Sequence, residues 1–260
     1  MSKDEFYIGY SDKGPGGIMA FVKKWALFIA IVVLAIGAAF ALAQKQFKNG
    51  TFELGTLTEI EGVLYTNPYP VLSIAIDGAR KDVLLLGFGK FGAEASLLEI
   101  SDGQGLDGLR LKLQGTLIYY DGITLMQLEP KVEGTYEVLG REELSTPGTG
   151  LGKVKLNGEI IDPKCYFGVM KPGHGKIHRS CAVRCISGGI PPVFLVQNEE
   201  GIANYYLLVG ENFEAANQDV LPHIGKPCTL EGSLTQRGDW MILEMSSDKI
   251  IELGTNSSVY

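Results

Sequence analysis

The sequence is short of positive charge and of histidine. Its 260 residues include 23 Lys and Arg against 30 Asp and Glu, a formal net charge of −7 at pH 7. A general nucleic-acid-binding protein needs a basic face to neutralise phosphates, so this class is excluded. Only three histidines are present, and none has an evident nucleophile to activate, which argues against hydrolysis.

The sequence also lacks the motifs of common enzyme classes. It contains no G-x-S-x-G elbow, no H-E-x-x-H, no P-loop and no C-x-x-C-H haem motif. Residues 87–92 are glycine-rich (GFGKFG). Because they follow a β-type segment of a β repeat, we expect a hairpin there rather than a nucleotide-binding turn. The sequence alone therefore gives no positive case for an enzyme.

Glycine is abundant and the chain is apolar enough to fold. Hydrophobic residues make up 45% of the sequence, which excludes wholesale disorder. The 34 glycines are about 13% of the chain, against a usual value of about 7%. They separate short apolar runs without a period of three, so we expect an all-β protein with many tight turns.

One long apolar run lies near the N-terminus. Residues 25–43 have no polar side chain except the indole of Trp25, and Lys23 and Lys24 precede them directly. We predict a transmembrane helix over 25–43, with residues 1–24 cytoplasmic and the C-terminal body outside the cytoplasm, in the periplasm. The alternative is a cleaved signal peptide, because residues 41–43 (ALA) resemble a cleavage site. Both interpretations export the same body.

The exported body is acidic. Residues 49–260 contain 17 of the basic and 27 of the acidic residues, a net charge near −10. We expect anionic lipid surfaces to repel such a body, so that only residues 25–43 hold it at the membrane.

The exported body contains a degenerate internal repeat of four β-type segments. In the first copy these are residues 61–64, 83–87, 108–115 and 122–129, and in the second 157–160, 206–210, 225–232 and 238–244. Alternating apolar residues and glycine kinks in this order predict two tandem small OB-like β-barrels. We place the first barrel at 49–139, a linker at 140–152 and the second barrel at 153–254.

The two copies differ by one insertion. The glycines Gly62 and Gly87 of the first copy are 25 positions apart, whereas Gly158 and Gly210 of the second are 52 apart. The extra residues correspond to 163–191, and they contain three of the four cysteines and two of the three histidines. Reactive residues concentrated in one insertion predict a site added to a repeated scaffold.

The spacing of these residues predicts a metal site. His178, Cys181 and Cys185 lie at i, i+3 and i+7, so a helix ending at Gly188-Gly189 places them on one face. Cys165 approaches from a separate strand end. Three thiols and one imidazole form a Cys₃His ligand set, which suits zinc, copper or iron.

Two alternatives remain open for the cysteines. A disulfide from Cys165 to Cys181 or Cys185 would be usual in an exported protein. It leaves an odd thiol, because Cys228 corresponds to Leu111 in the repeat and is expected in the core. A redox-active Cys181/Cys185 pair is the other alternative, although its spacing is not C-x-x-C. We expect His174 in a solvated turn and His223 on the surface.

Residues 158–196 resemble a group of exported or membrane-anchored bacterial proteins that have no established activity. Their pattern is D-x-x-C, then His, then C-A-x-x-C-I-x-x-G and a barrel strand. Here it falls on Asp162, Cys165, His178, residues 181–186 and Gly189, and the resemblance covers roughly the last 110 residues. It implies a compact OB-like domain and no particular reaction.

Together these features predict a single-pass membrane-anchored accessory or assembly protein of a membrane-bound complex, a redox complex included. The expected partners are the membrane and other subunits of that complex, and not nucleic acid. The alternatives are a thiol–disulfide or metal-redox enzyme that uses Cys181 and Cys185, and a structural envelope module with a disulfide-stapled insertion.

Overall fold

The computed structural model describes residues 14–44, 50–76, 78–100, 105–130, 134–142, 148–168, 170–198 and 200–254. The chain divides into two compact units, Met1–Lys48 and Asn49–Tyr260. Residues 1–13 of the expected cytoplasmic segment and residues 143–147 of the expected linker lie outside the described residues.

The first unit contains one helix, α1 (Gly16–Ala43), which begins earlier than the predicted residue 25. Its 28 residues correspond to a length of about 42 Å. An 18-residue window of α1 has a mean hydropathy of 2.8, and none of that window is buried. The helix is therefore long and apolar enough to cross a membrane, a property that it shares with signal sequences.

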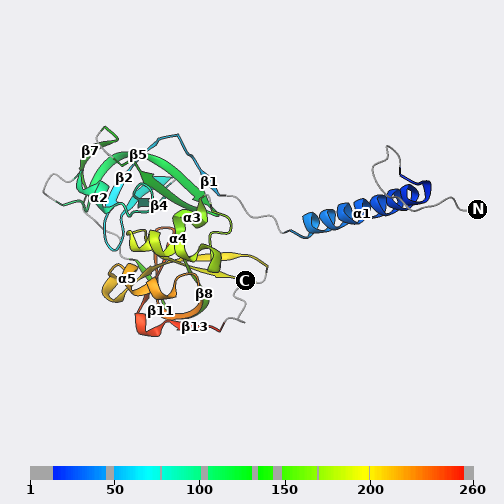
Figure 1. The fold of residues 1–260 in the computed structure, drawn as a ribbon. Helices are drawn as coiled ribbons and strands as arrows, with labels where there is room; N and C mark the ends of the chain where they lie inside the picture. The colour runs from blue at the N-terminus through cyan, green and yellow to red at the C-terminus, as the bar shows by residue number, and fades with distance from the viewer. Residues whose placement is uncertain are drawn as a thin grey trace, which may run out of the picture. The chain divides into compact units, whose positions relative to one another are not determined.

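The first barrel is a closed five-stranded sheet (Figure 1). Its strands are β2 (Thr58–Tyr65), β3 (Val71–Ile76), β4 (Ala79–Leu86), β5 (Leu109–Tyr120) and β6 (Ile123–Leu128). They pair in the order β5-β2-β3-β4-β6, and β6 returns to β5. The β4–β6 pair is parallel and the others are antiparallel. Short β1 (Thr51–Phe52) and β7 (Tyr136–Arg141) extend β5.

The second barrel repeats this topology. Its strands are β8 (Thr149–Ile161), β9 (Val193–Gln197), β10 (Ala203–Val209), β11 (Pro227–Arg237) and β12 (Trp240–Met245), with β13 (Ile251–Glu252) beside β11. They pair in the order β11-β8-β9-β10-β12, β12 closes on β11, and β10–β12 is the parallel pair. The predicted all-β fold with two OB-like barrels is confirmed.

Strand register shows that the repeat is structural. Gly62 faces Leu111 across β2 and β5, and Gly158 faces Cys228 across β8 and β11, the equivalence expected from the sequence. A Cβ atom on Gly158 would lie 2.2 Å from the backbone oxygen of Leu195. The first long strand of each barrel, β2 or β8, thus needs a glycine where it curls closely over its neighbour.

The chain turns back at residues 87–92 as expected, because Leu86 and Gly92 form an antiparallel bridge and the Gly87 N–H donates to the Phe91 oxygen. No third strand follows this turn; the chain enters the helix α2 (Glu94–Leu98), which the sequence analysis did not predict. The second barrel has the same arrangement, since Gly210 N–H donates to the Glu214 oxygen ahead of α5 (Asn217–Val220). The second barrel also contains the 3₁₀ turns η1 (Glu211–Phe213), η2 (Leu221–His223) and η3 (Ser247–Lys249).

The two barrels pack against each other through a shared apolar core. Each barrel has its own interior cluster, and a third cluster combines residues of both, with Tyr69 and Leu84 from the first barrel and Leu207 and Trp240 from the second. The Tyr69 hydroxyl donates to the backbone carbonyl oxygen of Leu208, and the Trp240 indole N–H donates to the backbone carbonyl oxygen of Asp82 at 3.0 Å. The body is thus a docked pair of barrels.

Candidate metal centre

The candidate site lies in the connection between the first two strands of the second barrel. Residues 66–70 join β2 to β3, whereas residues 162–192 join β8 to β9 and form the helices α3 (Pro163–Phe167) and α4 (Gly175–Ser187). Figure 1 shows both helices where the two barrels meet. This position follows from contacts on each side, because α3 touches β5 and α4 touches α5.

The helix α3 positions Cys165. It begins where β8 ends, and Asp162 caps its first turn through one carboxylate oxygen, Oδ1. That oxygen accepts the backbone N–H groups of Lys164 at 2.9 Å and Cys165 at 3.3 Å. Pro163 occupies the first helical position, where a missing N–H costs nothing. Cys165 therefore sits in a fixed turn of helix and not in a loose loop.

The helix α4 brings the other three residues to one face. His178, Cys181 and Cys185 lie within it as predicted; His178 and Cys185 are buried and Cys181 is partly exposed. The buried carboxylate of Glu159 in β8 accepts the N–H of Gly175 at the start of the helix. The helix ends at Ser187, and Gly189 adopts a φ of +100°, as the predicted glycine stop requires.

The structure gathers these residues into two overlapping ligand sets. One set is Cys165, His178 and Cys181, and the other is Asp162, Cys165 and Cys185; within each set the ligand atoms lie within 4.8 Å of one another. The four predicted ligands are divided between these two sets, which share Cys165, and among the described residues no single set holds all four as the predicted Cys₃His site requires. Asp162 was not among the predicted ligands, although it belongs to the D-x-x-C pattern.

Each set contains a buried polar atom that lacks a hydrogen-bond partner. Asp162 has no exposed surface and His178 is 3% exposed, yet Asp162 Oδ2 and His178 Nε2 have no partner among the described residues. A buried polar atom without a hydrogen bond costs about 1–3 kcal/mol, so native proteins seldom keep one without a reason. A metal ion that accepts these lone pairs would supply that reason.

The sulfur spacing also fits a metal site. The Sγ atoms of Cys165 and Cys181 are 4.0 Å apart. Two thiolates on a tetrahedral zinc ion, each at about 2.3 Å, lie about 3.8 Å apart, whereas a disulfide bond is about 2.05 Å long. All four cysteines are free thiols, so the disulfide alternative is not observed. Cys228 is fully buried in the second barrel, as expected.

Two lysines supply positive charge beside the cluster, and one comes from the first barrel. Lys90 Nζ lies 2.8 Å from Cys181 Sγ and 3.7 Å from Cys185 Sγ. Lys164 is buried and donates to the oxygens of Gly87 and Gly89 at 2.8 and 2.7 Å. The loop at residues 87–92 therefore closes over the insertion. Sequence spacing could not predict that Lys90 contacts Cys181 and Cys185, because these contacts depend on how the two barrels dock.

The local environment affects the protonation of the ligands. Burial lowers the pKa of His178, so its imidazole is neutral and has a free lone pair near pH 7. A hydrogen bond with Cys185, followed by burial, raises the pKa of the Cys165 thiol. The hydrogen bond to Cys181 raises the pKa of Lys90, and burial lowers the pKa of Lys164 to about 8.

The other two histidines lie outside both ligand sets. His174 is half-buried against the ring of Tyr166, 6.0 Å between centroids, which corrects the expected solvated turn. His223 pairs with Glu252 at 2.9 Å near the surface.

The first-barrel loop packs backbone to backbone on the end of α4. The Gly92 N–H donates to the Gly188 oxygen at 2.9 Å. A Cβ atom on Gly188 would lie 2.1 Å from the Lys90 oxygen. We expect Gly188→Ala to push the loop away and to lower the free energy of unfolding by about 1–3 kcal/mol, measured by urea denaturation. Gly150→Ala, whose Cβ meets nothing within 4 Å, should be nearly neutral; equal losses would contradict this packing argument.

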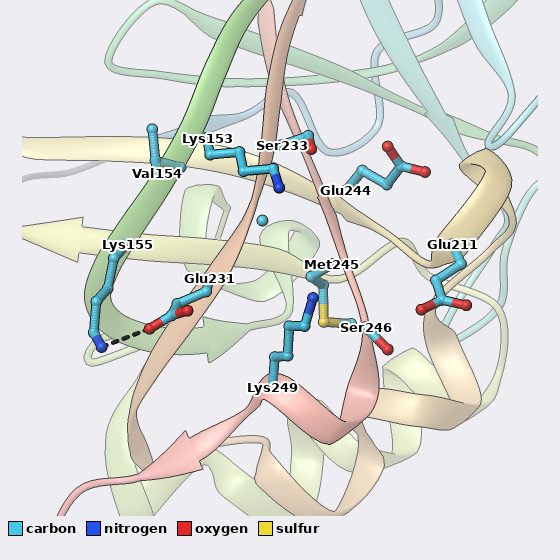
Figure 2. A pocket seen from close by; sticks show the side chains of 11 residues that line it. Lys153, Val154, Lys155, Glu211, Glu231, Ser233, Glu244, Met245, Ser246 and Lys249 are labelled. Carbon is cyan, nitrogen blue, oxygen red and sulfur yellow. Dashed lines mark ion pairs between the residues drawn. The ribbon is translucent and has the colours of Figure 1, made fainter.

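A separate groove of about 560 Å³ lies on the second barrel (Figure 2). Its charged residues have both signs, and Lys155 pairs with Glu231. The lining residues are Lys153, Val154, Lys155, Glu211, Glu231, Gly232, Ser233, Glu244, Met245, Ser246 and Lys249. None is a cysteine or a histidine, so the groove is distinct from the cluster.

In comparisons with known proteins, no family model, no curated protein and no solved structure matches the chain.

Proposed function

We propose that this chain is a single-pass membrane protein whose extracytoplasmic body binds zinc in the insertion of the second barrel. In this proposal it is an accessory or assembly subunit of a membrane-bound complex. The observation that carries the zinc site is the buried cluster of Asp162, Cys165, His178, Cys181 and Cys185, in which two polar atoms lack partners. The anchor is supported by the length and composition of α1.

The donor types favour zinc over the other metals considered. Zinc accepts thiolate, imidazole and carboxylate ligands at similar distances, and all three types occur in this cluster. Copper(I) prefers soft thiolates, so the carboxylate of Asp162 is a poor ligand for it. Iron–sulfur clusters are usually held by four cysteines, and the two ligand sets contain only three cysteines.

The proposed orientation rests on charge. Lys23 and Lys24 lie in the first part of α1, before its apolar stretch, and the acidic body follows at the other end of the chain. The positive-inside rule then puts the N-terminus in the cytoplasm and the barrels outside it. A docked pair of barrels on a membrane anchor gives a stiff body for contact with other subunits.

A second candidate function is thiol–disulfide exchange, and one observation favours it. The sulfur atoms of Cys165 and Cys181 are 4.0 Å apart, and the Lys90 ammonium lies 2.8 Å from the sulfur of Cys181. In that reaction these two thiols would lose two electrons and two protons and form a disulfide, while a substrate disulfide would become two thiols. The pair is Cys165/Cys181 and not the Cys181/Cys185 pair expected from the sequence.

The proposal is tested on the full chain in its own membrane. After extraction in mild detergent and native electrophoresis, we expect the chain to migrate in a larger assembly, with zinc in the same band. Alkylation followed by mass spectrometry should find the partly exposed Cys165 and Cys181 protected by zinc and reactive once a chelator removes it. Cys228, which is buried in the barrel core, should stay unreactive in both states.

The controls separate the two candidates. Cys181→Ser should lower the zinc content, whereas Cys228→Ala should leave it unchanged. A chain that contains no zinc, and in which Cys165 and Cys181 cycle between thiols and a disulfide, would replace the zinc proposal by the redox one. A band at the size of the chain alone would overturn the accessory role.

A further inference from the structure

The ligand cluster contains more donors than one tetrahedral ion uses. A structural zinc ion takes four protein ligands, and five side chains are present. They form two sets of three that share Cys165, and not one set of four around a common centre. The arrangement therefore has two places where an ion can meet three protein ligands, each ion keeping a fourth position for a ligand from outside the set.

The unsatisfied atoms are divided between these two places. His178 Nε2 belongs to the set with Cys181, and Asp162 Oδ2 belongs to the set with Cys185. One ion held by Cys165, His178 and Cys181 would leave Asp162 Oδ2 buried without a partner. Because Asp162 has no exposed surface, bulk water does not relieve that cost, and a second ion would.

The charges match two divalent ions. With the three thiols ionised, Asp162 and Cys165, Cys181 and Cys185 carry four negative charges, which two divalent ions neutralise. With only one ion, two negative charges remain, and Lys90 and Lys164 compensate them. Lys164 is fixed on two backbone oxygens, whereas Lys90 is an exposed residue that can move away. The Lys90 ammonium lies 2.8 Å from Cys181 Sγ of the first set and 3.7 Å from Cys185 Sγ of the second, so it stands beside both sets, where a bound ion can displace it.

We propose that the insertion binds two thiophilic divalent ions, bridged by the thiolate of Cys165. The first ion is held by His178 and Cys181, and the second by Asp162 and Cys185. A shared ligand places the ions about 3.5–4 Å apart, as in other two-metal sites. This inference rests on the proposed zinc-binding function and gives it a stoichiometry and a second ligand set.

The test is the stoichiometry of metal binding by the full chain in detergent. The metal-free, reduced protein is titrated with Zn²⁺ against a chromophoric chelator, and we expect two equivalents. Asp162→Asn keeps the capping oxygen of α3 but removes the carboxylate, so it should bind one equivalent. His178→Asn should also bind one, and His223→Asn, which removes a surface histidine, should still bind two.

A spectroscopic measurement establishes the bridge. With ¹¹³Cd²⁺ in place of zinc, we expect two resonances that both couple to the Cys165 β-protons. Asp162→Asn should lose one of them. Lys90→Met should bind Zn²⁺ at least tenfold more tightly, because no ammonium competes for the thiolates of Cys181 and Cys185.

The outcomes are distinct. One equivalent in the unmodified chain overturns the second position and leaves the proposed function intact, and no bound metal overturns both. If Asp162→Asn fails to fold, judged by its circular dichroism, Cys185→Ser takes its place with the same expected loss of one equivalent. Two equivalents in Asp162→Asn and also in Cys185→Ser would place the second ion elsewhere and overturn the proposal.

Discussion

Cys165→Ser is expected to abolish the stabilisation of the body by zinc. An ion that binds only the folded state at a thousand times its dissociation constant adds about 4 kcal/mol of stability. For a body of the size of residues 49–260, this raises the Tm by about 8–16 °C. Cys165 belongs to both ligand sets, so its loss removes the whole rise. The measurement is thermal unfolding of the full chain with zinc and with a chelator.

Cys228→Ala is the matched control for this experiment. It removes a cysteine that is buried in the core of the second barrel and belongs to neither ligand set. We expect a lower starting Tm and an unchanged rise with zinc. A rise that persists in Cys165→Ser would show that the ion binds without the shared thiolate.

Trp240→Ala is expected to lower the free energy of unfolding by about 3–5 kcal/mol, or roughly 6–20 °C in Tm. Trp240 is 1% exposed and packs in the apolar cluster between the barrels. Its indole N–H also donates to the Asp82 oxygen of the first barrel. The substitution leaves a cavity at the junction and removes that hydrogen bond. Chemical denaturation followed by circular dichroism measures the loss.

Two variants check the reason for this loss. Trp240→Phe keeps a ring in the interface but removes the N–H donor, so it should lose less than half as much. Trp25→Phe lies in α1, outside the body, and should leave the unfolding of the body unchanged. If Trp240→Ala did not lower the free energy of unfolding, the packing between the two barrels would contribute little to the stability of the body.

The barrels were predictable because their signal is local and occurs twice. Alternating apolar residues fix which face of each strand is buried, and Gly62 and Gly158 mark the point where a first strand curls over its neighbour. The helix α4 was predictable for the same reason, since its ligand spacing and its glycine stop lie within one segment. Periodicity of this kind needs no knowledge of distant contacts.

The docking of the barrels was not predictable from periodicity. The strand residues of their shared core, such as Leu84 and Leu207, look like any other buried strand residues, because both faces of these strands are buried. The role of Lys90 depends on this docking and was missed with it. The helix α2 was missed because it has only five residues, too few for a helical pattern to appear beside a glycine-rich turn.

Asp162 was missed for a different reason. An aspartate just before a proline at a helix start is adequately explained as a capping residue, and one of its oxygens does cap α3. Only the burial of its second oxygen shows that capping does not account for the whole carboxylate. Burial of a single atom depends on the assembled fold and leaves no trace in residue spacing.

The contact of Lys90 with the thiols of α4 also bears on how this duplicated body has been able to diverge. Each half of a tandem duplication is usually free to drift on its own, so long as it still folds. Here a change in one loop of the first half alters the electrostatic surroundings of sulfur atoms in the second. The first barrel, whose described residues contribute no member of either ligand set, is therefore tied to the chemistry of the second through this one loop.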